Sequence, residues 1–279
     1  MIKNILFSVA ILFSMNIAMS QNKAIRVEVH GKGKPILFLP GFTTPGSIWK
    51  ETVKNLTVTK ETHLISYAGF NGIDPIEMPW YSSIKKELIT YIKENNLQEI
   101  EIIGHSMGGT LAVDIAAALP NLVTKIILVD ALPCMREVMM PNVPATSIQY
   151  ESPYNNQMLK MDDAQFKGMA NMMATNMTNN KEKIETVKKW ILEADRKTYV
   201  YGYTDLLKLD LRNDLSKIKA KTLILGAPTY GTVAKENMEK QYANLADKTI
   251  EMAPSGKHFI MFDESEWFYK KVNSFLTSE

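Results

Sequence analysis

Two hydrophobic patterns take turns along this chain: short apolar runs, and longer stretches whose apolar residues recur every three or four positions. The first pattern is typical of buried strands and the second of amphipathic helices. Strands that alternate with helices predict an α/β protein with a doubly wound, mainly parallel sheet. We expect strands at residues 24–30, 35–39, 62–67, 99–104, 125–129, 222–225 and 249–252, and helices at 47–56, 81–94, 110–119, 234–242 and 267–276.

The alternation stops between about residues 134 and 213. This segment contains only helical patterns, at 163–177, 181–195 and 203–208, and it holds nine of the 17 methionines. We therefore predict a helical cap at 134–213, inserted into a core formed by residues 21–133 and 214–279. Methionine adapts to irregular apolar shapes. The cap methionines either cover an apolar pocket or pack as a small core of their own.

The first twenty residues have the pattern of a signal peptide. Lys3 precedes an apolar run at residues 5–18, and the small residues Ala18 and Ser20 stand just before Gln21. We predict that residues 1–20 are removed and that the protein is exported, either to a bacterial periplasm or to the medium. The run is short for a transmembrane helix. An uncleaved membrane anchor is the alternative, and after cleavage we expect no stable membrane span.

Composition excludes several other classes of protein. A chain of 279 residues that is 46% hydrophobic can bury one large core. The formal charge of +2, without a basic block, does not indicate nucleic acid or an anionic membrane surface as a partner. Cys134 is the only cysteine, so no internal disulfide forms. Without a metal-ligand cluster or a dinucleotide fingerprint, we expect no metal and no cofactor. Nothing in the pattern predicts an oligomeric state.

The most informative motif is the sequence IGHSMGG at residues 103–109. It lies between a predicted strand and a predicted helix, which is the setting of a nucleophile elbow with Ser106 as the exposed nucleophile. Gly104 and Gly108 leave room for the sharp turn. The helix that follows directs its amino end toward the site, which makes the Met107 N–H a candidate donor for a developing oxyanion.

Together with three other features, this motif makes the chain resemble the α/β-hydrolase superfamily. The resemblance covers nearly all of the mature sequence, and the nucleophile precedes the last histidine, as in the family. It implies the α/β-hydrolase fold and a serine hydrolase. The other features are the helical insertion, the sequence GKHF at residues 256–259, and an early pair of motifs, HG at 30–31 and LPGF at 39–42.

A serine hydroxyl is a weak nucleophile at neutral pH and needs a base within hydrogen-bond reach. The resemblance implies His258 for this role, because the family keeps its base in the loop after the last strand. The other histidines are His30, His63 and His105. We expect His105 to point away from its neighbour at the elbow and to pack in the core. We expect His30 near the oxyanion loop and His63 at the start of a strand.

The third member of the predicted triad departs from the usual pattern. Most relatives carry an acid just after the strand that here spans 222–225, but the loop at 226–232 holds no carboxylate. Some relatives, among them certain haloalkane dehalogenases, carry the acid at the end of the strand after the elbow helix. That strand end here holds Asp130, which we favour. The alternatives are Glu236, the first carboxylate after the empty loop, and the absence of any acid.

The resemblance also implies a second oxyanion donor, the Phe42 N–H in the loop after residue 39. From their positions near strand ends and in the cap, we expect a set of apolar side chains to contact the substrate. These are Phe42, Tyr67, Met139, Met173 and Tyr230.

These residues together predict a secreted serine hydrolase that cleaves an ester through a Ser-His-Asp triad and an acyl-enzyme, with amide and thioester bonds as lesser alternatives. The expected substrate is a small molecule with a largely apolar acyl group. Two rival functions stay open at this point. One is a non-hydrolytic small-molecule binder on the same fold, which the missing late acid suggests, and the other is an acyltransferase.

Overall fold

The computed structural model describes residues 23–228 and 235–278. The predicted signal peptide at residues 1–20 and the pocket candidate Tyr230 lie outside these residues. None of the helices in the described ranges combines the length and the apolar character that crossing a membrane requires.

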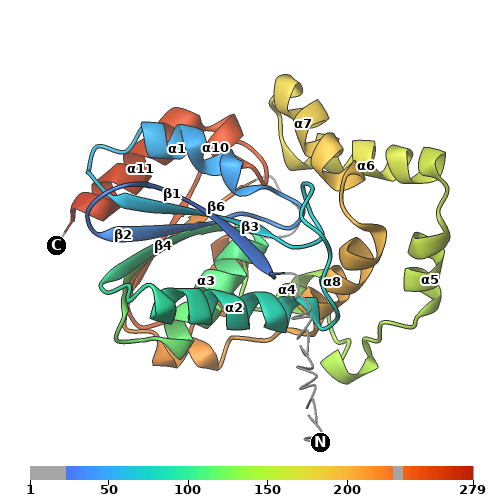
Figure 1. The fold of residues 1–279 in the computed structure, drawn as a ribbon, viewed down its shortest axis with the longest axis horizontal. Coiled ribbons are helices and arrows are strands. Elements are labelled where there is room, and N and C mark those ends of the chain that lie inside the picture. Colours follow the sequence, from blue (N-terminus) through green and yellow to red (C-terminus); the bar gives the residue numbers. More distant parts are fainter. Residues whose placement is uncertain (1–22, 229–234, 279) are drawn as a thin grey trace, which may run out of the picture.

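Seven strands of the described chain form one sheet in the order β1-β3-β2-β4-β5-β6-β7 (Figure 1). Only β1 runs antiparallel, against β3, and the other neighbours are parallel. The predicted doubly wound, mainly parallel sheet is therefore confirmed. The strands are β1 Ile25–Gly31, β2 Pro35–Leu39, β3 Glu61–Tyr67, β4 Ile100–His105, β5 Val123–Val129, β6 Lys221–Gly226 and β7 Lys248–Met252.

Helices cover both faces of this sheet, which is why its central strands are largely buried and rich in isoleucine, leucine and valine. The helices α1 (Lys50–Lys54) and α11 (Ser265–Thr277) lie on one face, and α2 (Trp80–Glu94) and α3 (Met107–Ala118) lie on the other (Figure 1). Every residue of β4 is buried. On the first face the ring of Trp49 stacks on that of Phe268 of α11, with centroids 6.4 Å apart.

Five helices lie between β5 and β6, in the segment for which a helical insertion was predicted. They are α4 Met135–Met139, α5 Pro153–Lys160, α6 Asp163–Met177, α7 Lys181–Leu192 and α8 Arg196–Lys208. They stand at one end of the sheet, with α6 and α7 packed together as a hairpin (Figure 1). The main-chain N–H of Tyr81 in α2 donates to Asp205 Oδ2 in α8 over 3.0 Å. This bond joins the insertion to the core.

Several element limits differ from those that the pattern predicts, and side-chain caps account for part of the difference. The pattern at 203–208 is only the last half of α8, because Asp195 caps the helix and accepts from Thr198 N at 2.7 Å. Helix α5 was not predicted, and Ser152 caps it in the same way. The predicted helix at 47–56 is a 3-10 turn at Gly46–Trp49 followed by the short α1.

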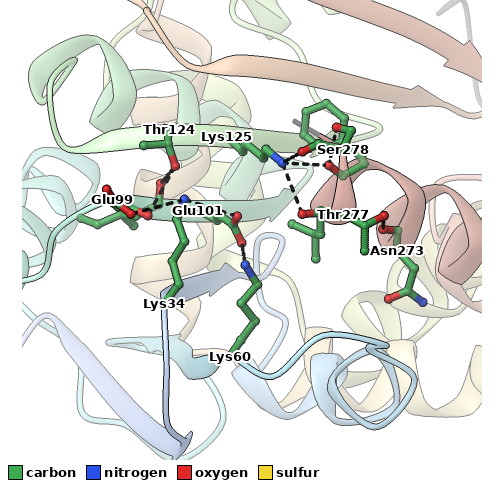
Figure 2. Close-up of polar contacts among 12 residues, drawn as sticks. Lys34, Lys60, Glu99, Glu101, Thr124, Lys125, Asn273, Thr277 and Ser278 are labelled. Carbon is green, nitrogen blue, oxygen red and sulfur yellow. Dashed lines mark hydrogen bonds and ion pairs between the residues drawn. The ribbon is translucent and has the colours of Figure 1, made fainter.

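The amino-terminal end of the sheet contains a group of buried charges (Figure 2). The side chain of Glu101, on β4, is only 2% exposed and lies 2.6 Å from Lys60 Nζ and 3.7 Å from Lys34 Nζ. On β5, Lys125 donates to the main-chain oxygens of Phe275 and Leu276, each over 3.2 Å. The two Lys125 bonds fasten the end of α11 to the sheet, at the amino-terminal end of the parallel strands.

Candidate active site

Ser106 occupies a strained turn between β4 and α3. Its backbone angles, φ 54° and ψ −124°, are rarely adopted by a residue with a side chain. The turn is held because Ser106 N donates to the main-chain oxygen of Val129 over 2.9 Å. It is also tightly packed: a Cβ on Gly108 would lie 2.2 Å from the main-chain oxygen of Leu39. This is the strand–turn–helix geometry of a nucleophile elbow.

A carboxylate and an imidazole meet beside this turn. Asp130 directly follows β5, and its Oδ2 lies 2.7 Å from Nδ1 of His258. Both residues are 8% exposed. An imidazole that donates its Nδ1–H to a carboxylate keeps Nε2 as a proton acceptor. The pair therefore has the chemistry of a general base with an orienting acid.

The loop after β6 supplies a donor in place of the acid that the family usually carries there. The main-chain N–H of Ala227 donates to Asp130 Oδ1 over 3.0 Å. Asp130 N in turn donates to the main-chain oxygen of Leu225 over 2.8 Å. Glu236 lies exposed in α9 (Lys235–Gln241). The carboxylate that meets the imidazole in this structure is thus that of Asp130.

His105 is fully buried and contacts the catalytic candidate rather than only packing. Its Nε2 lies 3.0 Å from the main-chain oxygen of His258, and the two ring centroids are 4.5 Å apart. Burial lowers the pKa of His105 well below its usual value, and the nearby His258 lowers it further. The ring is therefore neutral, and it donates Nε2–H to the loop that carries His258.

The remaining two histidines lie away from this site. His63 in β3 has a hydrogen-bond partner at each ring nitrogen: Nδ1 lies 2.7 Å from the Tyr91 hydroxyl and Nε2 lies 3.0 Å from Glu61 Oε1. His30 is exposed on β1 and pairs with Thr62 near the amino end of β3. The expectation that His30 lies near the loop after β2 is wrong. Because β1 runs antiparallel to β3, His30 lies beside the amino end of β3, whereas that loop lies at the carboxyl ends of the parallel strands.

The residues that carry the two predicted oxyanion donors, Phe42 and Met107, line the same cavity as Ser106. Met107 is the first residue of α3, so its N–H has no acceptor within the helix. The loop after β2 packs directly on the elbow: a Cβ on Gly41 would lie 3.3 Å from the Ser106 Cβ and 2.8 Å from His105 Nδ1. Phe42 follows Gly41 and lines the same cavity as Ser106 and Met107.

Above these residues lies a cavity of about 210 Å³ whose outer wall comes from the insertion. In the described part of the chain, no lysine, arginine or glutamate lines it, and Asp130 is its single carboxylate. The wall is built of apolar side chains, among them Met135, Val138, Met139, Met173, Met177 and Leu206.

Three of the five predicted substrate contacts lie in this lining, namely Phe42, Met139 and Met173. Tyr67 does not belong to the lining. Its ring is 1% exposed, packs against Trp80 with centroids 6.0 Å apart, and donates its hydroxyl to the main-chain oxygen of Pro40 over 3.3 Å. The prediction for Tyr67 is corrected accordingly, because the residue faces the core beneath the oxyanion loop. Tyr230 lies outside the described residues.

Residues 34–265 match the family model of the α/β hydrolase fold. The chain belongs to this family. Among the relatives of this hydrolase, a pimeloyl-[acyl-carrier protein] methyl ester esterase of Aeromonas hydrophila is 23% identical over 266 residues, which are 91% of this chain and 99% of the relative. An N-formylmaleamate deformylase of Pseudomonas putida is 19% identical over 253 residues, 88% of this chain and 90% of the relative.

A solved esterase from Exiguobacterium antarcticum has the same fold as this hydrolase. The two superpose with a TM-score of 0.78 at 19% identity, covering 92% of this chain and 98% of the other. The named relatives and the family make the protein an enzyme of the hydrolase class. The roles of individual side chains stay predictions, and so does the absence of a metal. The described residues hold no group of three His, Cys, Asp or Glu side chains placed to bind one.

Proposed function

We propose that this hydrolase cleaves esters of small apolar acids through Ser106, His258 and Asp130. The observation that carries the proposal is the 2.7 Å contact between His258 Nδ1 and Asp130 Oδ2, at the rim of the same cavity that Ser106 lines. A neutral imidazole held in this tautomer is the base that a serine hydroxyl needs.

In the proposed reaction the Ser106 oxygen attacks the ester carbonyl while its proton passes to His258 Nε2. The negative charge on the carbonyl oxygen is stabilised by the N–H groups of Phe42 and Met107. Collapse of this intermediate breaks the ester bond, and the leaving alcohol takes the proton from His258. Water then attacks the acyl-enzyme with the same base, which releases the acid and restores Ser106.

The cavity supports an uncharged acyl group of small to medium size. Its walls are largely apolar and hold no lysine or arginine in the described residues, so a carboxylate on the acyl chain would be buried without a cationic side chain to pair with. We propose that the insertion at residues 134–213 acts as a cap that supplies this wall. The methyl ester named for the Aeromonas hydrophila relative supports an ester as the bond cleaved.

The test is a panel of p-nitrophenyl esters with acyl chains of rising length, measured on the wild type and on Ser106→Ala. We expect steady turnover in the wild type, a preference for short to medium chains, and no turnover in the variant. An organophosphonate probe should label the wild type only. Ligand binding without turnover would instead support a non-hydrolytic binder, and product analysis with a competing alcohol would reveal acyl transfer.

We also propose that the protein is exported after removal of residues 1–20, on the sequence pattern alone. The test is cell fractionation of the full chain followed by mass spectrometry of its amino terminus. A mature chain beginning near Gln21 outside the cytoplasm is the expected result. An intact amino terminus in the membrane fraction would support the anchor.

A further inference from the structure

The three-residue loop that carries His258 is held by a separate hydrogen bond at each position. Lys257 N donates to Asp263 Oδ2 over 2.8 Å. The main-chain oxygen of His258 accepts from His105, and Phe259 N donates to the main-chain oxygen of Met177 over 3.0 Å. The loop is therefore fixed by three different parts of the chain: α10 (Ile260–Asp263), the elbow, and the end of α6 in the insertion.

Asp263 binds both the His258 loop and the insertion. Its Oδ1 accepts from the hydroxyl of Thr178 over 2.5 Å and from Asn179 N over 2.9 Å, both in the turn between α6 and α7. Asn180 N also donates to Oδ1, over 3.2 Å. One carboxylate thus joins the turn of the α6–α7 hairpin to the residue next to His258. Every group that contacts it in this way is a donor.

The hairpin that Asp263 holds is also a wall of the cavity, because Met173 and Met177 of α6 line it. Gly256, which directly precedes the loop, has φ 96°, a conformation that favours glycine. The hydrogen bonds at residues 257–259 hold the loop, and His258 with it, in place relative to this wall. Of the side chains that take part, Asp263 is bonded both to this loop and to the α6–α7 hairpin.

We propose that Asp263 is a positioning residue for the catalytic base. It holds the His258 loop and the α6–α7 hairpin in a fixed relation, so that the imidazole faces Ser106 whenever the wall of the cavity is in place. This inference rests on the proposed function of His258. An amide cannot replace the carboxylate, because its NH₂ group would face one of the donors that Asp263 accepts from.

The test compares Asp263→Asn with the control Glu266→Gln, which makes the same change of charge at an exposed residue three positions further on. We expect kcat of Asp263→Asn to fall by about tenfold to a hundredfold, the scale of a misplaced catalytic group, with KM changed far less. The control should keep the wild-type kcat. In Asp263→Asn the low-field proton NMR signal of His258 Nδ1–H should broaden, and in Glu266→Gln it should persist.

A second variant, Thr178→Val, decides the matter if Asp263→Asn does not fold. It removes only the hydroxyl on the hairpin side, and we expect a smaller fall in kcat with partial broadening of the same signal. Wild-type kcat and an unchanged signal in the folded variants would overturn the inference. A wild type that neither hydrolyses esters nor reacts with the organophosphonate would instead overturn the proposed function, while the NMR signal would still test the positioning role.

Discussion

Two residues of the proposed triad have left-handed backbone angles, Ser106 with φ 54° and Asp130 with φ 44°. Such conformations cost about 1–3 kcal/mol each and persist only where surrounding contacts hold them. Here the neighbouring strands do so. Ser106 N donates to Val129 in β5, and Asp130 N donates to Leu225 in β6. Each residue is thus held in its turn by the strand beside its own, which sets where its side chain can reach.

The carboxylate of Asp130 should matter for turnover and little for folding. In Asp130→Asn an amide faces His258 Nδ1, so the ring can adopt the wrong tautomer. We expect kcat to fall by roughly a thousandfold or more, with a nearly unchanged thermal unfolding midpoint. Kinetics with p-nitrophenyl butyrate measure the effect, with Glu236→Gln as the control at wild-type rate. A near-wild-type kcat in Asp130→Asn would remove the acid from the proposed mechanism.

His105 should make the free energy of unfolding depend on pH. Its pKa in the folded protein lies well below the usual 6.5, since burial opposes the charged ring. Below pH 6.5 the unfolded chain therefore binds a proton that the folded chain does not, and stability is lost as pH falls, by up to about 1.4 kcal/mol per pH unit. Above pH 6.5 this contribution is constant.

Urea denaturation of the wild type and of His105→Gln at pH 7.5 and pH 5 measures this effect. The stability advantage of the wild type should shrink at the lower pH. His63, whose pKa burial also lowers, is present in both proteins and cancels in the difference. Parallel stability profiles for the two proteins would show that His105 does not contribute the predicted term.

How much of the site the sequence could predict depends on the kind of group involved. Ser106 and His258 lie in recognisable motifs, so residue type and order along the chain are enough to predict them. Asp130 followed only from a resemblance and an empty loop. The Ala227 donor could not be predicted, because a main-chain N–H is the same for almost every residue and leaves no mark in the sequence.

At the scale of elements, α6 both shapes the cavity and contacts the His258 loop. Its limits, Asp163–Met177, match the predicted helix, since the capping box of Asp162 and Gln165 and the change of pattern after residue 177 mark its ends. The contact of its last turn with Phe259 was not predictable. It joins residues about eighty positions apart, and no local pattern records that pairing.

One side chain of this helix should set the preferred length of the acyl chain. Met173 lines the cavity and accepts a hydrogen bond from Tyr199 at its sulfur, over 3.2 Å. In Met173→Ala the cavity grows, so kcat/KM for octanoyl relative to butanoyl esters should rise about tenfold or more. The neighbouring Met172, 59% exposed on the same helix, offers the control Met172→Ala. An equal change in both variants would mean that Met173 does not contact the acyl chain.

At the scale of the whole molecule, charged groups at one end of the sheet belong to the candidate site, and those at the other end hold the structure together. The carboxyl ends hold the site. The amino ends hold Glu101, Lys60 and Lys34, with Lys125 nearby on β5 (Figure 2). The sequence pattern predicted Glu101 within a strand, but not that a glutamate in that strand is buried against lysines from the two turns before β2 and β3.

Breaking this group should lower stability without slowing the enzyme. In Lys60→Met the carboxylate of Glu101 stays buried with only the more distant Lys34, and loss of a buried partner costs about 3 kcal/mol. We expect that decrease in the free energy of unfolding by urea denaturation, with wild-type kcat at 25 °C. The exposed Lys54→Met is the control for loss of one positive charge. A parallel loss of kcat in Lys60→Met would link the two ends of the sheet.

The contact between Asp130 and Ala227 has a consequence for how relatives of this protein diverge. The end of β5 and the loop after β6 lie side by side, since Ala227 N donates to Asp130 Oδ1, so a carboxylate in that loop would also lie close to the imidazole of His258. In this protein the end of β5 supplies the carboxylate and the loop after β6 supplies the N–H donor; an acid in the loop would reverse these two roles. The position beside the imidazole can therefore be filled by a carboxylate from either of two segments of the chain.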